Sequence, residues 1–132
     1  MSLKSVHPQY SQFLPEWTAM RDFHAGEKAV KDKGTDYLPP TSGMILDGMA
    51  PNQLGLKIYE SYKARAVFPD YVKEGVEALM GLIHQHDAKI ELPARMEYLR
   101  TRATVAGESL LMLLRKINEE QLISGRLGLL VD

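Results

Sequence analysis

The feature that most constrains the fold is the stretch from Phe68 to Asp87, "FPDYVKEGVEALMGLIHQHD", where apolar residues recur at helical spacing. The apolar positions in it are Val72, Val76, Leu79, Met80 and Ile83. Lys73, Glu74 and Glu77 fall between them, so one face is apolar and the opposite face is charged. Pro69 and Asp70 supply a start and a cap. The pattern predicts an amphipathic helix in which Leu79 faces a core.

The N-terminal segment carries a second apolar stripe with spacings of three and four. Its members are Phe13, Trp17, Met20 and either Phe23 or His24. Pro15 suits the first turn of a helix, so we expect the helix to begin between Leu14 and Glu16. Gly26 should weaken this helix, and Gly34 should end it.

Residues 35–55 are rich in proline and glycine and have no clear period. We expect an extended loop there, with residues 39–51 as its mobile part, because loops of this length are often functional or disordered. Asn52 should then cap a helix with one apolar face. That face is formed by Leu54, Ile58 and Tyr62.

The second half of the chain predicts two further helices and a strand. "AKIELP" should be extended up to Pro93. A helix lined by Met96, Leu99 and Ala103 should end at Gly107, and a long helix should run from Glu108 to Ile123. "RLGLLVD", residues 126–132, has the pattern of a strand but no partner in the chain, so we expect it to be frayed or paired with another copy. The predicted fold is a single domain over residues 1–132, mainly α, with four to six helices in a bundle-like arrangement and a single C-terminal strand.

Composition limits the class of protein. An apolar fraction of 45% and a charged fraction of 25% are typical of a globular domain. Sixteen basic and 17 acidic residues leave a net charge of −1, which gives no electrostatic signal for nucleic acid. The chain has no cysteine, and no apolar run is long enough to cross a bilayer, so we expect an intracellular protein without a membrane partner.

The most metal-like cluster is "HQHD", which contains His84, His86 and Asp87. Only His84 and Asp87, three residues apart, share a helix face. A zinc site needs three or four ligands, and the neighbouring sequence supplies no others. We interpret the cluster as a polar helix end, where histidine is favoured by the helix dipole.

No other cluster predicts catalysis. Glu119 and Glu120 are adjacent on a helix and point apart, and Glu74 with Glu77 should lie on a solvated face. Ser109 lacks a nucleophile motif, and the glycines of "SGRLG" are not a phosphate loop. We therefore expect no enzyme activity and no catalytic, cofactor-binding or metal-binding residue.

Basic and aromatic side chains leave two interpretations open. The basic residues of the second half are Arg95, Arg100, Arg102, Arg115, Lys116 and Arg126, and they can form a basic surface. Ordinary ion pairing is the simpler interpretation, with Glu91, Glu97, Glu108 and Glu119 as partners. Phe13, Trp17 and Phe23 are interpreted as core aromatics and not as a stacking platform.

Several short motifs occur in a characteristic order along nearly the whole chain. They are "HPQY" (7–10), "WTAMRDFHAGEKAVK" (17–31), "YLP" (37–39), "YESYKARAVF" (59–68), "GLI" and "KIELP" (81–93), "GESL" (107–110) and "ISGRLGLLVD" (123–132). In this order they resemble the N-terminal region of a portal-like protein family of tailed phages and prophages.

The resemblance implies a structural protein of the phage head. Portal proteins self-associate into a ring at one vertex, through which DNA is packaged and ejected, and they bind the terminase and the head and connector proteins. Such a protein is expected in the host cytoplasm during assembly and then in the virion. Family members are longer and continue into a β-containing body, so DNA would be contacted only through parts that this chain lacks. The resemblance therefore implies an N-terminal fragment, an engineered piece or a prophage remnant whose helices belong to the outer, wing-like part of a subunit.

Two alternatives remain open. The chain could be a non-enzymatic helical protein-interaction module of a prophage or bacterial host, because it is neutral and has no catalytic constellation. It could also be a nucleic-acid-binding domain built on the arginine faces, which predicts salt-dependent DNA binding.

Overall fold

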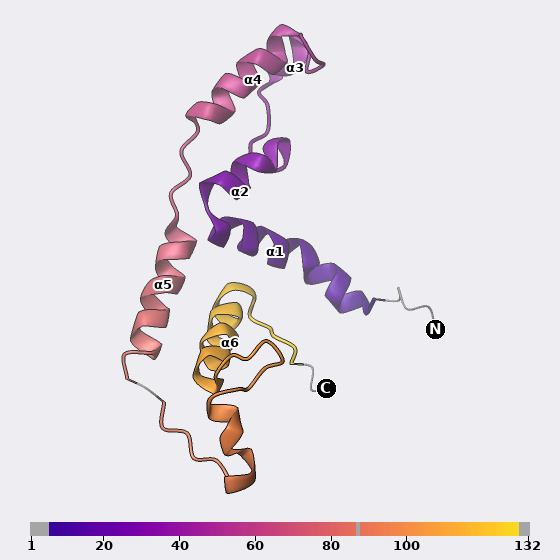
Figure 1. Ribbon diagram of the computed structural model, residues 1–132. Coiled ribbons are helices and arrows are strands. Elements are labelled where there is room, and N and C mark those ends of the chain that lie inside the picture. The colour runs from indigo at the N-terminus through magenta and orange to yellow at the C-terminus, as the bar shows by residue number, and fades with distance from the viewer. Residues whose placement is uncertain (1–5, 87, 130–132) are drawn as a thin grey trace. The chain divides into compact units, whose positions relative to one another are not determined.

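The computed structural model describes residues 6–86 and 88–129 (Figure 1). The predicted mainly helical class is confirmed, because most of these residues lie in helices. In chain order the helices are α1 (Pro8–Ala25), α2 (Glu27–Asp32), the 3-10 helix η1 (Gly34–Asp36), α3 (Ser42–Leu46), α4 (Leu54–Arg65), α5 (Tyr71–Ile83), the 3-10 helix η2 (Ala94–Arg100) and α6 (Leu110–Ser124).

The chain divides into two compact units. Unit 2 consists of residues 22–73, and unit 1 combines residues up to 21 with those from 74 onward. Unit 2 is therefore inserted between the two parts of unit 1 along the sequence. The expectation of a single domain over residues 1–132 stays a prediction.

Helix α1 begins earlier than predicted. Pro8 takes its first position, and the backbone N–H groups of Tyr10 and Ser11 donate to the carbonyl of His7 at 2.9 and 3.2 Å. Proline suits this position because its missing N–H would have no partner inside the helix. The predicted start between Leu14 and Glu16 is therefore wrong. Pro15 lies inside the helix, where it costs one backbone hydrogen bond.

Gly26 does more than weaken the first helix, because it separates α1 from α2. Its φ of 91° lies in the left-handed region that favours glycine. A Cβ there would also lie only 3.2 Å from Oδ1 of Asp70. Gly34, with φ 56°, follows the end of α2 and begins η1, close to the predicted stop.

The segment predicted to be an extended loop contains helix α3, which packs closely on α4. The contact is made through Gly55, where a Cβ would stand 1.9 Å from the carbonyl oxygen of Met44 and 2.5 Å from that of Gly48. The backbone N–H of Leu56 donates to the Gly48 carbonyl at 3.0 Å. The extended-loop prediction is therefore wrong for Ser42–Leu46, and the mobility of residues 39–51 stays a prediction.

The buried face of α4 differs from the predicted one. Gly55 and Tyr59, one turn apart, are buried, whereas Leu54 and Ile58 are exposed. Asn52 is not the cap: it has φ 73°, and Gln53 takes the cap position without a side-chain hydrogen bond. The prediction assumed that the larger apolar side chains face inward, but the close α3 backbone selects the glycine side of the helix.

Helix α5 forms where the sequence predicts, but with a narrower buried stripe. Val76 is 7% exposed, and Val72 and Met80, one turn to either side, are partly buried. Leu79 is 47% exposed, and Ile83 is also exposed. The prediction that Leu79 faces a core is therefore wrong.

In unit 1 the chain enters α6 through a tight turn. The backbone N–H of Ala103 donates to the Glu108 carbonyl at 2.6 Å, and the Glu108 N–H donates to the Thr104 hydroxyl at 3.1 Å. Ser109 caps the helix by accepting from the backbone N–H of Met112 at 3.3 Å. The helix predicted to be lined by Met96, Leu99 and Ala103 and to end at Gly107 is instead the tighter η2, which ends at Arg100.

The predicted C-terminal strand is not supported in the described part of the chain. Gly125, with φ 69°, ends α6 in a left-handed turn. The Ser124 hydroxyl lies within hydrogen-bond distance of two carbonyls, that of Glu120 inside the helix at 2.9 Å and that of Arg126 beyond the turn at 3.0 Å. No strand occurs among residues 6–86 and 88–129 to serve as a partner. Residues 130–132 of the predicted strand lie outside the described residues.

Candidate functional site

A groove in unit 1 lies between α1 and the segment that follows α6. It has a volume of about 440 Å³ and is open to solvent. Its lining combines aromatic, basic and small residues: Tyr10, Trp17, Arg21, Ser124, Arg126, Leu127 and Gly128. The left-handed turn at Gly125 ends α6, and the residue after it, Arg126, lies against Phe13 and Trp17 of α1.

The wall of this groove is an aromatic cluster covered by an arginine. Trp17 stacks on Phe13, with ring centroids 6.1 Å apart, and meets Tyr10 edge-on at 5.2 Å. The guanidinium carbon of Arg126 lies 5.7 Å from the centroids of both Phe13 and Trp17. This is within the distance at which a cation is attracted to the face of an aromatic ring.

A second arginine completes the polar part of the groove. Arg21 NH2 donates to Oε2 of Glu120 at 3.1 Å, and both side chains remain well exposed. An exposed ion pair of this kind contributes little to stability, ~0–1 kcal/mol. Arg21 is therefore held in place near the aromatic cluster by a weak interaction that a stronger anion can replace.

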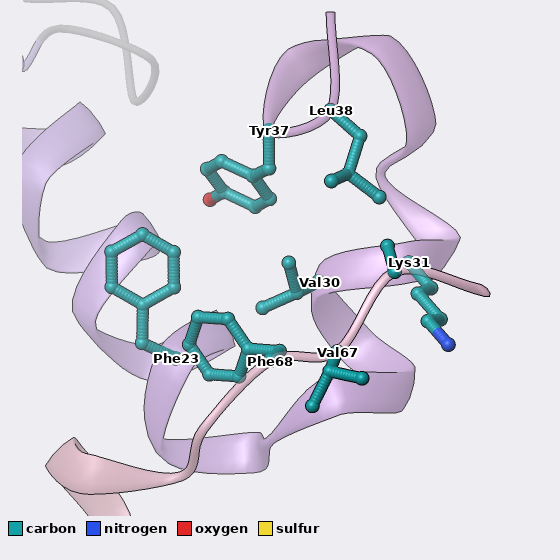
Figure 2. Close-up of a pocket in the computed structure, with 8 residues that line it drawn as sticks. Phe23, Val30, Lys31, Tyr37, Leu38, Val67 and Phe68 are labelled. Atoms are coloured by element: carbon teal, nitrogen blue, oxygen red, sulfur yellow. The ribbon is translucent and has the colours of Figure 1, made fainter. Parts of the chain in front are cut away.

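Unit 2 contains a smaller hollow of about 200 Å³ (Figure 2). Its walls are nearly all apolar: Phe23, Val30, Tyr37, Leu38, Ala66, Val67 and Phe68, with Lys31 at its edge. The ring of Phe23 lies 5.2 Å from that of Tyr37 and 5.6 Å from that of Phe68. The ammonium group of Lys31 points away from the rings, donating to the Ala64 carbonyl at 3.1 Å and pairing with Glu27 at 2.5 Å. Such a hollow can accept an apolar side chain but offers no group for chemistry.

The hydroxyl of Tyr37, which follows η1, is hydrogen-bonded to Asp22 of α1. It donates to Oδ2 of Asp22 at 2.7 Å, and the same carboxylate pairs with Lys33 at 3.4 Å. The hydrogen bond to Asp22, reinforced by burial, raises the pKa of Tyr37 to about 12. The buried hydroxyl of Tyr59 also has a raised pKa, because burial disfavours the phenolate.

Apolar side chains are exposed on the paired helices α3 and α4. Leu46 is 87% exposed, and Ile45, Leu54 and Ile58 on the same two helices are also exposed. We call these four residues the α3–α4 apolar patch. Single exposed apolar residues are ordinary, but several together on two packed helices are typical of an interaction surface.

The residues of the metal-like cluster fare differently in the structure. The ring Nε2 of His84 lies 3.2 Å from the side-chain nitrogen of Asn118, which is a hydrogen-bond distance. His86 is exposed, and Asp87 is outside the described residues. Within residues 6–86 and 88–129, no three metal-ligating side chains come together.

The acidic and basic residues follow the ion-pairing interpretation in part. Arg100 pairs with Glu97 and also donates to the Ile90 carbonyl at 2.7 Å. Lys116 pairs with Glu108. Glu91 pairs with Lys89 instead of an arginine. Glu74 and Glu77 are exposed, as predicted. The basic residues Arg95, Arg102 and Arg115 are also exposed.

The aromatic residues are not a shared core. Phe13 and Trp17 belong to unit 1 and Phe23 to unit 2, and all three are only partly buried. Sequence reasoning missed the contact of Arg126 with Phe13 and Trp17, because residues more than a hundred positions apart leave no periodic signal. It also missed the role of Gly55, although a glycine inside a helix pattern is a known sign of close packing.

Comparison with protein-family models, with curated proteins and with solved structures gave no match to this chain. In the part of the chain that the structure describes, none of the helices has the length and apolar character needed to cross a membrane.

Proposed function

We propose that the chain is a structural part of a portal-like protein of a tailed phage or prophage, acting in the ring at the head vertex through which DNA is packaged and ejected. The support from sequence is the ordered set of motifs between residues 7 and 132. The mainly helical structure fits the outer, wing-like part of such a subunit. In this proposal the terminase and the head and connector proteins are partners of the assembled ring.

The structural observation that carries the proposal is the α3–α4 apolar patch. A closed ring is built from heterologous contacts, in which one face of each subunit meets a different face of the next. The exposed leucine and isoleucine side chains of the patch are suited to such a contact, because burying them removes apolar surface from water. A neighbouring copy of the same chain is the occupant that a ring supplies.

The test uses the complete gene product that contains this chain. Negative-stain electron microscopy of the purified protein should reveal closed rings, and peptides from this chain should be found by mass spectrometry in purified phage heads. A gene product that stays monomeric at high concentration, from a gene with no neighbouring terminase or head genes, would remove the proposal. In that case the helical interaction module becomes the better account, and a co-purifying partner outside any phage context would identify it.

A further inference from the structure

The groove of unit 1 brings together two kinds of group that are far apart in the sequence. Tyr10 and Trp17 offer aromatic surface from α1, while Arg21 and Arg126 bring two guanidinium groups to the same lining. Within the described residues, Arg126 makes no ion pair: its guanidinium lies against Phe13 and Trp17. The N–H donors of a guanidinium lie in its plane, so a group held by its face can still donate outward.

This combination selects a class of ligand. Two guanidinium groups favour an anion, and the phosphate group matches their paired donors. Aromatic side chains beside them favour a flat ring in the same ligand, as in sites that bind nucleotides along a single strand. The volume of about 440 Å³ is within the ~300–1,000 Å³ of small-molecule sites, which is enough for one nucleotide.

The charge around the groove also fits a single phosphate. Glu120 is the acidic partner of Arg21, so the two arginines and this carboxylate leave one net positive charge. The overall net charge of −1 argues against a long electrostatic track for nucleic acid, but it does not bear on one local site. An incoming phosphate would displace Glu120 from Arg21, which costs little because that pair is exposed.

We propose that this groove binds a nucleotide, with the phosphate between Arg21 and Arg126 and the base against Tyr10 and Trp17. The ligand is a free nucleotide or one unit of a single-stranded nucleic acid, since the two share this chemistry. The proposal goes beyond the structural role proposed above and does not depend on it.

Trp17 is the only tryptophan of the chain and lies in the groove wall, so its fluorescence reports binding directly. The intact chain is titrated at low salt with thymidine monophosphate, with a short oligothymidylate and with inorganic phosphate. We expect a saturable change in Trp17 emission with the first two. Equal affinity for the mononucleotide and the oligonucleotide assigns the site to free nucleotides, whereas at least about tenfold tighter binding of the oligonucleotide assigns it to a single strand.

Two variants of the groove and one control separate this site from general attraction to a charged surface. Arg126→Gln should weaken binding by about tenfold or more, because a charge-assisted hydrogen bond to phosphate is lost. Glu120→Gln should strengthen binding by about threefold, because Arg21 no longer has a competing carboxylate. Arg102→Gln is the control: it makes the same charge change as Arg126→Gln at an exposed position just after η2, in the same unit. This change should alter the affinity by less than about twofold.

Three results would overturn the proposal. The first is the absence of any saturable change in Trp17 emission at low salt. The second is inorganic phosphate competing as well as the nucleotide, which would leave the aromatic side chains without a role. The third is equal weakening of nucleotide binding by Arg126→Gln and Arg102→Gln. If Arg126→Gln does not fold, nucleotide binding to Glu120→Gln that is unchanged or weaker than to the unmodified chain overturns the proposal instead.

Discussion

The hydrogen bond between Tyr37 and Asp22 makes a prediction about pH. The pKa of Tyr37 is raised from 10.0 to about 12, so the neutral phenol is favoured in the folded state. The stabilisation is therefore fully present below pH 10.0, the value for the unfolded chain, and is lost as the pH rises through about 12. At neutral pH, Tyr37→Phe should lower the free energy of unfolding by ~1–2 kcal/mol, because one hydrogen bond to a charged group is removed.

Urea unfolding of both proteins over a range of alkaline pH measures this difference. Because the two proteins share all other titrating groups, the difference between their free energies isolates Tyr37. We expect it to shrink toward zero near pH 12. A difference that stays constant with pH would contradict the raised pKa of Tyr37, because Tyr37→Phe keeps the ring that packs against Phe23 and removes only the hydroxyl.

Gly55 makes the second prediction at the scale of one residue. Gly55→Ala should destabilise the chain by ~3 kcal/mol or more, because the added Cβ would meet the Met44 carbonyl oxygen at 1.9 Å. Gly75→Ala is the matched control: it lies inside α5 with nothing within 4 Å of its Cβ position. That change should stabilise by ~0.5–1 kcal/mol, since alanine favours a helix over glycine. Chemical denaturation of the two variants compares them, and similar effects would contradict the close α3–α4 approach.

At the scale of an element, α5 allows the buried Val76 to be compared with the exposed Leu79 on the same helix. Val76→Ala should lower the free energy of unfolding by ~2 kcal/mol, because two buried methyl groups are removed and a cavity is left. Leu79→Ala removes more apolar atoms but from a side chain that is about half exposed, so we expect ~1 kcal/mol or less. Urea melts rank the pair, and a larger effect at Leu79 would restore the face predicted from the sequence.

The helices show how much the sequence could predict. The periods around Val76 and Leu114 predict α5 and α6 correctly, because regular apolar spacing reports a local geometry. The start of α1 at Pro8 and the helix α3 escaped prediction, since short or weakly amphipathic helices carry little periodic signal. The face of α4 escaped because burial there depends on the α3 backbone at Gly55, which is a tertiary contact.

The candidate groove was even less predictable. Tyr10 and Trp17 lie at one end of the chain, and Arg126 lies at the other. The turn at Gly125 could be expected from its glycine, but the approach of Arg126 to Phe13 and Trp17 is a contact between distant parts of the chain that no local pattern reports. Sequence analysis interpreted Phe13 and Trp17 as core aromatics and Arg126 as an ion-pairing residue, so it gave no indication that these side chains meet.

At the scale of the whole molecule, the α3–α4 apolar patch predicts self-association. Apolar side chains exposed together favour association as the concentration rises, and salt should weaken it little because few charges are involved. Leu46→Asp should reduce the association measured by sedimentation velocity, while leaving the helical signal in circular dichroism unchanged because Leu46 is 87% exposed. Leu82→Asp, at an exposed leucine of α5 outside the patch, is the control and should have a smaller effect. Equal effects of the two changes would locate the contact elsewhere.

The insertion of unit 2 between the two parts of unit 1 has a consequence for biosynthesis. Every residue of unit 2 has been synthesised once Lys73 is added, whereas unit 1, which includes α1 up to Arg21, also needs α6, which ends at Ser124. At the usual rates of translation this interval lasts ~3–10 s. Throughout this interval Phe13 and Trp17 are already part of the chain, while Arg126, which covers them in the folded protein, has not yet been added. The faces of Phe13 and Trp17 therefore stay uncovered on the growing chain until Arg126 is added.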